Sequence, residues 1–515
     1  MTEDRMSLAQ GVRRCFARKS IATLQLDAVS HGLRRVLGPV HLALLGVGCT
    51  VGAGIYVMPG HAAAHFAGPA VVLAFLLAGA GCAFIALCYA EMCTMMPVSG
   101  SAYTYCYAAM GEIVAWALGW LLLLEFGLSC AMLAVGFSGY FVSLLHNFGL
   151  TVPTSMSTPT VHEAIAGHSA AIAVGTSVNA IAAAAVLVSM LILVVGISTS
   201  ASVNSLLVVV KVLVLVAFIA VGAGAVHFNN WVPFIPPNEG GFTYGWQGII
   251  RAASILFYAF MGFETVSTAT SESRNPQKDM PIGILGALIA CTVLYIGAAS
   301  VLTGIVPFRE LGVPDPIALA ADRMGHPQFS VLVKAGALAG LSSVLLGVMY
   351  GQTRIAFAMS RDGLLPPLFS RLHSGFRTPW LGTLALGSIS ALGAALLPLS
   401  LLADLVSLGS AFAFMAVCVS LMWLRSTQPQ LARPFSVPFG GVWIGRAWIG
   451  FVPAFAVVFC LTMIVPVLMD IVGNALHGQP LPALILIIYT TAGILIYFGY
   501  GMRRSTLAAT LANPQ

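Results

Sequence analysis

Charged residues are scarce in this chain. Only 8% of its 515 residues are Asp, Glu, Lys or Arg, whereas 59% are hydrophobic and the mean hydropathy is +0.94. Soluble domains carry roughly 25% charged residues, so the composition excludes a soluble globular protein and indicates a polytopic membrane protein. We expect the lipid bilayer as its surroundings and no nucleic-acid partner, because the net charge of +6 follows from membrane topology.

The motifs of a catalytic or metal-binding module are also missing. The ten cysteines form no CxxC pair, and we expect small buried hydrophobes rather than disulfides or metal ligands. The eleven histidines include no HExxH motif, and His61 and His65, which come nearest to a metal-binding pair, have no Glu between them. The first twenty residues are too polar for a signal peptide. We therefore predict no enzymatic activity, no metal and no cofactor.

Long apolar stretches dominate the sequence instead. Twelve of them reach about 20 residues, the length of a membrane-spanning helix, and we predict spans at roughly 40–62, 69–95, 113–145, 172–197, 202–226, 247–270, 281–306, 330–358, 379–398, 401–424, 448–471 and 482–502. Almost nothing polar separates the fourth span from the fifth or the ninth from the tenth. Lys and Arg concentrate in the N-terminal arm and in the loops on the same side, which predicts a multi-pass protein of the cell membrane with both termini in the cytoplasm.

Two of these stretches are interrupted. The segment GVGCTVGAGIYVMPG, residues 46–60, holds five glycines and a proline in the first stretch, and SILFYAFMGFETVSTATSE, residues 254–272, places a glycine and a glutamate in the middle of the sixth. Matching breaks in two halves of opposite orientation are typical of transporters built from inverted repeats. We predict an all-α integral membrane protein with twelve transmembrane helices, a 5+5 inverted repeat with broken helices 1 and 6, and two extra helices.

This prediction divides the chain into five parts. They are a cytoplasmic N-terminal arm (1–38), the first inverted repeat (39–226), the second inverted repeat (247–425), the two extra helices (448–503) and a cytoplasmic tail (504–515).

The first break itself suggests a binding site. Unwinding from about Thr50 to Gly54 frees backbone groups at the membrane midplane, where they are tolerated only if they line a cavity. The broken helix ends carry partial charges that suit a zwitterion, and Gly52, Ala53 and Gly54 leave their amides unshielded. The alternative interpretation is a helix-packing face of small residues.

Ionisable residues deep inside apolar stretches are further candidates. Lys211, in the fifth stretch, could bind and release protons or could extend to the membrane interface. Glu264, beside the second break, could hold a proton, gate the cavity or pair with a neighbouring helix. Glu125, in the third stretch, could sense a basic substrate or support the structure, and Glu91, in the second, is expected to make a structural or gating contact.

Five ordered segments carry a family resemblance. They cover most of residues 38–425 and read GVGCTVGAGIYVMPG, YAEMCTMMPVSGSAYTY, GEIVAWALGW, FYAFMGFETVSTATSESRNPQKDMPIGI and YGQTRIAFAMSRDGLLP. Together they resemble the amino acid–polyamine–organocation superfamily, which has the inverted-repeat fold of the leucine transporter. Within it the segments are most similar to the cationic amino acid transporter family.

The resemblance implies a substrate site at the two breaks. The substrate carboxylate would contact the amides of Ala53 and Gly54, and Tyr258 would close over the substrate as an aromatic gate. The substrate amino group would contact the carbonyl groups of Thr50, Tyr258, Ala259 and Met261.

The resemblance also implies proton coupling. Lys211 matches a lysine that occupies the space of a sodium ion in sodium-coupled relatives, and it would contact the backbone around Gly48 and the hydroxyl of Ser343. Two positions depart from the family pattern: Glu264 stands where Asp is usual, and Leu121 stands where Asp is common. Glu125 is retained, which is compatible with a basic substrate.

Three functional hypotheses follow. The first is a proton-coupled symporter of L-amino acids driven by the proton gradient, with cationic substrates such as arginine, lysine and ornithine ahead of small neutral ones such as alanine. The second is an amino acid exchanger of the same fold. The third, an amino acid sensor or channel, has less support because no continuous polar pore is evident. The sequence leaves open a small membrane subunit or a sterol-like lipid as a partner.

Overall fold

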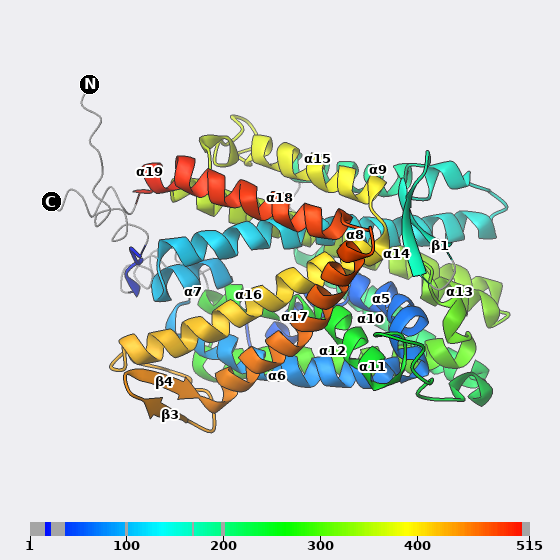
Figure 1. Ribbon diagram of the computed structural model, residues 1–515, viewed down its shortest axis with the longest axis horizontal. Coiled ribbons are helices and arrows are strands. Elements are labelled where there is room, and N and C mark those ends of the chain that lie inside the picture. The colour runs from blue at the N-terminus through cyan, green and yellow to red at the C-terminus, as the bar shows by residue number, and fades with distance from the viewer. Residues whose placement is uncertain (1–15, 22–36, 98–100, 167–168, 197–200, 507–515) are drawn as a thin grey trace.

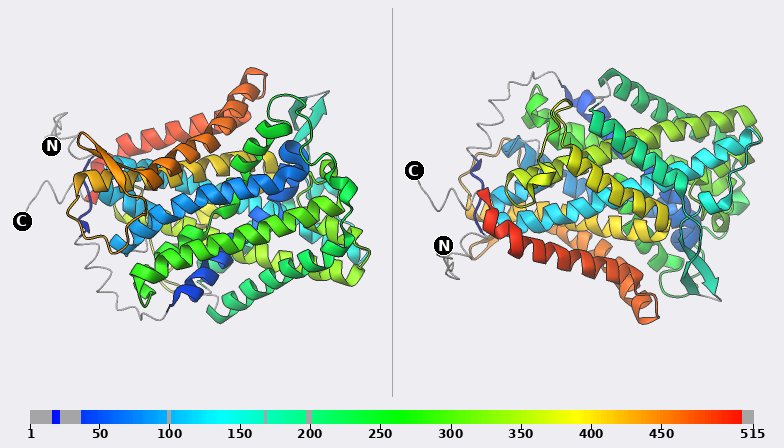
Figure 2. Two further views of the ribbon diagram at one scale, coloured as in Figure 1. Left: turned by 90° about the horizontal axis from the view of Figure 1, so that it is seen from below. Right: turned by 90° about the horizontal axis from the view of Figure 1, so that it is seen from above.

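The computed structural model describes residues 16–21, 37–97, 101–166, 169–196 and 201–506. Its long helices form an elongated bundle (Figure 1). Helix α19 (Met502–Arg504) and the hairpin of β3 (Gly441–Ile444) and β4 (Ala447–Gly450) lie at one end, which we call the α19 end. The hairpin of β1 (Val161–Ala166) and β2 (Ser169–Val174) lies at the opposite end, the β1 end (Figures 1 and 2).

The helices follow the apolar stretches of the sequence. The first half contains α3 (Pro39–Thr50), α4 (Ala53–Tyr56), α5 (Met58–Ala62), α6 (Val71–Met95), α7 (Ser101–Ala109), α8 (Glu112–Asn147), α9 (Ala180–Val195) and α10 (Ala201–Gly222). The second half contains α11 (Gly245–Leu256), α12 (Pro276–Ile305), α13 (Pro316–Arg323), α14 (Pro327–Arg361), α15 (Trp380–Leu396) and α16 (Leu399–Thr427), followed by α17 (Phe451–Leu476) and α18 (Leu481–Ile496).

Short turns of 3-10 or π-helix extend or connect these helices. They are η1 (Ala63–Ala67), η2 (Gly68–Ala70), η3 (Thr154–Met156), η4 (Ala223–Ala225), η5 (Phe228–Trp231), η6 (Phe257–Phe260), η7 (Phe263–Glu272), η8 (Phe308–Glu310), η9 (Pro367–Phe369) and η10 (Tyr497–Gly501).

The described helices are suited to a bilayer. Nine helical segments are long and apolar enough to cross a membrane, and the three shorter apolar helices are α3, α9 and α15. Each of the twelve predicted spans overlaps at least one of these segments. The chain is therefore a multi-pass helical membrane protein.

Two predicted helix starts are wrong. The fourth span was predicted from residue 172, but 169–174 pair with 161–166 as an antiparallel hairpin and α9 begins at Ala180. Apolarity alone does not distinguish a short strand from a helix. The start of α9 is fixed by a polar cap, because Asn179 Oδ1 accepts the amide of Ala182 at 3.0 Å. The eleventh span was predicted from residue 448, but residues 447–450 form β4 and α17 starts at Phe451.

Close backbone approach brings α3 against α12. A Cβ on Gly46 would lie 2.5 Å from the Cβ of Ala287, and a Cβ on Gly283 would lie 2.6 Å from the Cβ of Leu42. Neither position has room for a side chain, so α3, the helix that precedes the first break, packs closely against α12. This packing fixes α3 while leaving the segment after Thr50 unwound.

Candidate substrate site at the helix breaks

The first break lies where the sequence predicted it. Helix α3 ends at Thr50 and α4 begins at Ala53, and the carbonyl of Gly52 accepts the amides of Ile55 and Tyr56 at 3.1 Å each. The amides of Gly52, Ala53 and Gly54 have no acceptor within the described part of the chain. They form the buried, unpaired N-terminal end of a short helix, a geometry that favours an anionic group.

The second break follows α11 and η6. Gly262 has a φ of +119°, and η7 starts at the next residue. Glu264 caps this break, because its Oε2 accepts the amide of Gly262 at 2.7 Å. The carbonyl of Tyr258 accepts the amide of Met261 at 2.8 Å. Glu264 therefore stabilises the unwound backbone of its own segment.

The two breaks are in backbone contact. A Cβ on Gly54 would lie 2.4 Å from the Cα of Ala259, and a Cβ on Gly262 would lie 2.7 Å from the carbonyl carbon of Cys49. Sequence patterns assigned Gly54 the role of exposing amides and marked Gly262 as the site of the second break. The structure adds a packing requirement, since any side chain would push the two breaks apart.

Tyr295 of α12 joins the two breaks and was missed in the sequence. Its hydroxyl lies 2.9 Å from the carbonyl oxygens of both Thr50 and Ala259. Together with the Tyr258 carbonyl, which accepts the amide of Met261, three of the four carbonyls that the resemblance assigned to the substrate amino group already have a protein partner. A tyrosine in the middle of an apolar span was the available signal, because a buried phenol needs a hydrogen-bond partner.

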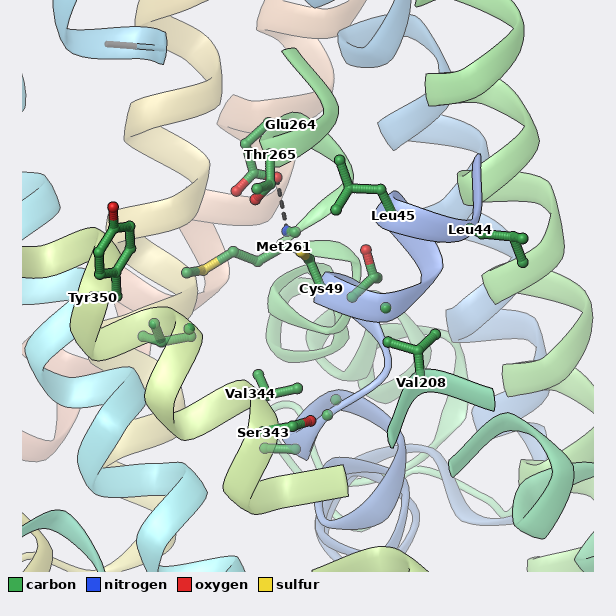
Figure 3. A pocket seen from close by; sticks show the side chains of 18 of the residues that line it. Leu44, Leu45, Cys49, Val208, Met261, Glu264, Thr265, Ser343, Val344 and Tyr350 are labelled. Atoms are coloured by element: carbon green, nitrogen blue, oxygen red, sulfur yellow. Dashed lines mark hydrogen bonds between the residues drawn. The ribbon is translucent and has the colours of Figure 1, made fainter. Parts of the chain in front are cut away.

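A cavity of about 680 Å³ opens beside the breaks (Figure 3). It extends from the first break along α3, α10 and α14 toward the α19 end, reaching His41 and Tyr350. Predicted site residues that line it are Gly48, Thr50, Gly52, Ala53, Gly54, Tyr258, Met261, Glu264 and Ser343. Three predicted site residues, Ala259, Glu125 and Lys211, are not among the lining residues.

Lys211 reaches the first break from α10. Its side chain is fully buried, and its ammonium donates a hydrogen bond to the carbonyl of Gly48, as the resemblance implied. Tyr56 donates to the carbonyl of Lys211 at 3.0 Å, so the same residue is held from both sides of the break. Among the described residues, no carboxylate lies within 4 Å of the ammonium.

The expected contact between Lys211 and Ser343 is absent from the described hydrogen bonds. The hydroxyl of Ser343 instead donates to the carbonyl of Gly340 at 2.8 Å. A serine inside a helix commonly bonds a carbonyl of the preceding turn. The neighbouring Ser342, the alternative partner, likewise donates to Leu338 at 2.7 Å.

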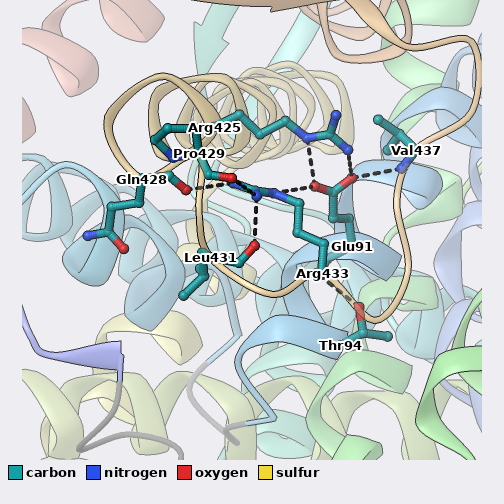
Figure 4. Close-up of polar contacts among 8 residues, drawn as sticks. All are labelled: Glu91, Thr94, Arg425, Gln428, Pro429, Leu431, Arg433 and Val437. Atoms are coloured by element: carbon teal, nitrogen blue, oxygen red, sulfur yellow. Dashed lines mark hydrogen bonds and ion pairs between the residues drawn. The ribbon is translucent and has the colours of Figure 1, made fainter.

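The two remaining buried glutamates contact other helices. Glu125 of α8 accepts a hydrogen bond from Ser410 of α16 at 2.5 Å, and its Oε2 has no partner among the described residues. Glu91 of α6 is fully buried at the α19 end, where it accepts hydrogen bonds from Arg425 and from the amide of Val437 (Figure 4). Arg433 lies 3.6 Å from the same carboxylate. Glu91 thus makes a structural contact, one of the two roles expected of it.

Ion pairs and hydrogen bonds join helices toward the β1 end of the bundle. Arg251 of α11, 1% exposed, pairs with Asp404 of α16 at 2.7 Å and with Asp470 of α17 at 2.5 Å. Tyr140 of α8 donates to the carbonyl of Tyr56 at 2.6 Å. These contacts join several helices on the side away from the cavity.

Comparison with known proteins identifies the family of the chain. A family model described as an amino acid permease matches residues 37–493. The chain is 37% identical over 492 residues to the methylthioribose transporter of Bacillus subtilis (strain 168), covering 96% of this chain and 99% of that protein. It is 37% identical over 495 residues to the branched-chain amino acid permease BcaP of the same strain, covering 96% and 98%.

A eukaryotic relative is similar over a shorter length. The chain is 34% identical over 400 residues to the vacuolar cationic amino acid transporter 4 of Arabidopsis thaliana, covering 78% of this chain and 65% of that protein. The family match and these relatives agree with the resemblance carried by the five segments. The chain belongs to the amino acid permease family.

Proposed function

We propose that this protein is a secondary active transporter that carries L-amino acids across the cell membrane together with protons. The observation that carries the proposal is the cavity at the two helix breaks, where the amides of Gly52, Ala53 and Gly54 have no acceptor among the described residues. A substrate carboxylate would accept hydrogen bonds from these amides. The amino group would donate hydrogen bonds to the carbonyl of Met261 and to the second lone pairs of the Thr50 and Ala259 carbonyls.

The lining of the cavity favours an uncharged substrate side chain. Next to the breaks it presents Phe126, Val344 and Val348, and the glutamate that favoured cationic substrates, Glu125, is not part of the lining. Glu264 does line the cavity, but its carboxylate already accepts the amide of Gly262. One relative is named for branched-chain amino acids and another for methylthioribose. We therefore place apolar amino acids such as leucine ahead of arginine, lysine and ornithine, which the sequence had favoured.

Lys211 is the proposed coupling residue. A fixed ammonium repels a sodium ion at 4 Å by about 4 kcal/mol at an effective dielectric of 20, which disfavours a sodium site beside the first break. The hydrogen bond from Lys211 to Gly48 ties α10 to α3. Gain or loss of a proton at this ammonium would strengthen or release that tie and so gate the cavity.

The proposed architecture is the 5+5 inverted repeat of twelve transmembrane helices, with both termini in the cytoplasm. In that orientation the cavity opens to the cytoplasm and the β1 end faces outward. Transport then requires that the contacts of Arg251 break while the α19 end closes. Binding drives such a change only to the extent that the substrate prefers one state.

Labelled leucine uptake into proteoliposomes tests the proposal. The vesicles are empty inside, the potential is clamped at zero, and an acid-outside pH gradient is present or absent. Gradient-stimulated accumulation is the expected result. Uptake that appears only after preloading with an amino acid would replace symport by exchange, and no uptake of leucine, alanine or arginine under either condition would overturn amino acid transport.

A further inference from the structure

We propose that the side chain of Met261 screens the cavity from the buried acid Glu125 and thereby selects substrates with uncharged side chains. The inference rests on the proposed function, and it gives the Met261 side chain a role separate from that of its backbone. Without this screen, Glu125 would become a site for a cationic side chain.

The screen is a short series of contacts that leads away from the cavity. Met261 follows η6 and lines the cavity (Figure 3). Its sulfur lies 3.9 Å from the hydroxyl of Ser410, and that hydroxyl donates to Glu125 at 2.5 Å. Neither Ser410 nor Glu125 is among the described residues that line the cavity. The methionine is therefore in contact with both the cavity and the group that holds the acid.

Glu125 has unused capacity to bind a cation. The residue is 2% exposed, and one of its two carboxylate oxygens has no hydrogen-bond partner among the described residues. A buried carboxyl group in this state gains from a charged hydrogen-bond donor far more than an exposed one would. A lysine, ornithine or arginine side chain at the breaks carries such a donor.

The acid itself is fixed in place by packing. A Cβ on Gly409 would lie 3.0 Å from the Cβ of Glu125, so α16 and α8 are in close contact behind the carboxylate. The variable part of the barrier is consequently Met261, whose unbranched thioether is flexible. Its backbone, with φ −56° and ψ 134°, suits any residue, so a shorter side chain introduces no strain.

The experiment compares four proteins by ligand-induced thermal stabilisation and by competition with leucine uptake. They are the wild type, Met261→Ala, Met261→Leu and the double variant Met261→Ala with Glu125→Gln. We expect Met261→Ala to bind lysine and arginine at least about tenfold more tightly than the wild type, a change of 1.4 kcal/mol. Met261→Leu, which conserves side-chain volume, should show no gain for lysine or arginine over the wild type. The double variant should lose the gain while it still binds leucine.

Each other outcome contradicts a particular step. Leucine binding by Met261→Ala without any gain for lysine or arginine would overturn the screen, and so would a wild type that already binds these cations as tightly as leucine. A gain that persists with Glu125→Gln would exclude the glutamate. If Met261→Ala does not fold, Met261→Ser takes its place. A wild type that binds none of these amino acids would instead overturn the proposed function.

Discussion

Gly54 faces the backbone of Ala259 across the two breaks, and a Cβ at position 54 would lie 2.4 Å from the Ala259 Cα. We predict that Gly54→Ala lowers leucine affinity at least about tenfold and reduces the unfolding temperature, because overpacking of this kind costs about 1–3 kcal/mol. Gly347→Ala is the matched control, since Gly347 lines the same cavity but has open space around it. Equal effects of the two substitutions in a thermal-shift titration would contradict the backbone contact.

A substitution at Lys211 should separate proton coupling from substrate binding. We predict that Lys211→Met abolishes accumulation driven by a pH gradient but leaves exchange of labelled for unlabelled leucine at zero gradient. The reason is that the variant loses the ammonium that donates to Gly48, whereas the amides of the first break stay in place. The exposed Lys278 provides the control Lys278→Met. Intact gradient-driven accumulation in Lys211→Met would place coupling at another group.

At the scale of elements, the two helix breaks could be predicted from the sequence, but the side chains from other helices that contact the site could not. Glycine density marks an unwound segment because glycine stabilises a helix poorly, so the interruption after Thr50 is visible in the sequence. Tyr295 and Ser410, in contrast, reach the site from α12 and α16, and no local pattern reveals which carbonyl or carboxylate each one meets. Residues 172–174 of the strand 169–174 were predicted as helix, because hydropathy alone does not distinguish a short strand from a helix.

The segment after α16 is attached to α6 through Glu91, which allows a prediction for this element. Arg425 pairs with the buried carboxylate and also stacks on Trp448 of β4, with its guanidinium carbon 4.2 Å from the ring centre. We predict that Glu91→Gln destabilises the protein by about 3–5 kcal/mol, because the substitution leaves buried arginine charge without its partner.

The control for the buried Glu91 is a solvent-exposed ion pair. Glu310 and Arg323 form a pair with side chains 51% and 37% exposed, and Glu310→Gln should change stability by about 0–1 kcal/mol. Unfolding in detergent, followed by denaturant titration, measures both variants. A loss for Glu91→Gln no larger than that for Glu310→Gln would show that the segment is held by its other contacts.

At the scale of the whole molecule, the described cavity extends toward the α19 end, whereas Arg251 joins helices toward the β1 end. The proposed transport cycle therefore requires the contacts at the β1 end to break. Arg251 makes two of these contacts, one to α16 and one to α17. We predict that Asp470→Asn weakens the closed β1 end and shifts the population toward states in which that end opens and the α19 end closes. A differential stabilisation of about 1.4 kcal/mol would change the ratio of the two states tenfold.

Labelling of the native Cys49 measures this shift, so no cysteine has to be introduced. It lines the cavity and is half-buried, whereas the other cysteines in the described part of the chain are buried. A membrane-impermeant maleimide applied to the face at the α19 end should label Cys49 in the wild type. We expect Asp470→Asn to slow labelling by about twofold or more, in a Cys15→Ser background because Cys15 lies outside the described residues. Saturating leucine during labelling should protect Cys49 in both proteins. Glu310→Gln, which alters only an exposed pair, should leave the rate unchanged, and an unchanged rate in Asp470→Asn as well would mean that Arg251 does not control opening of the β1 end.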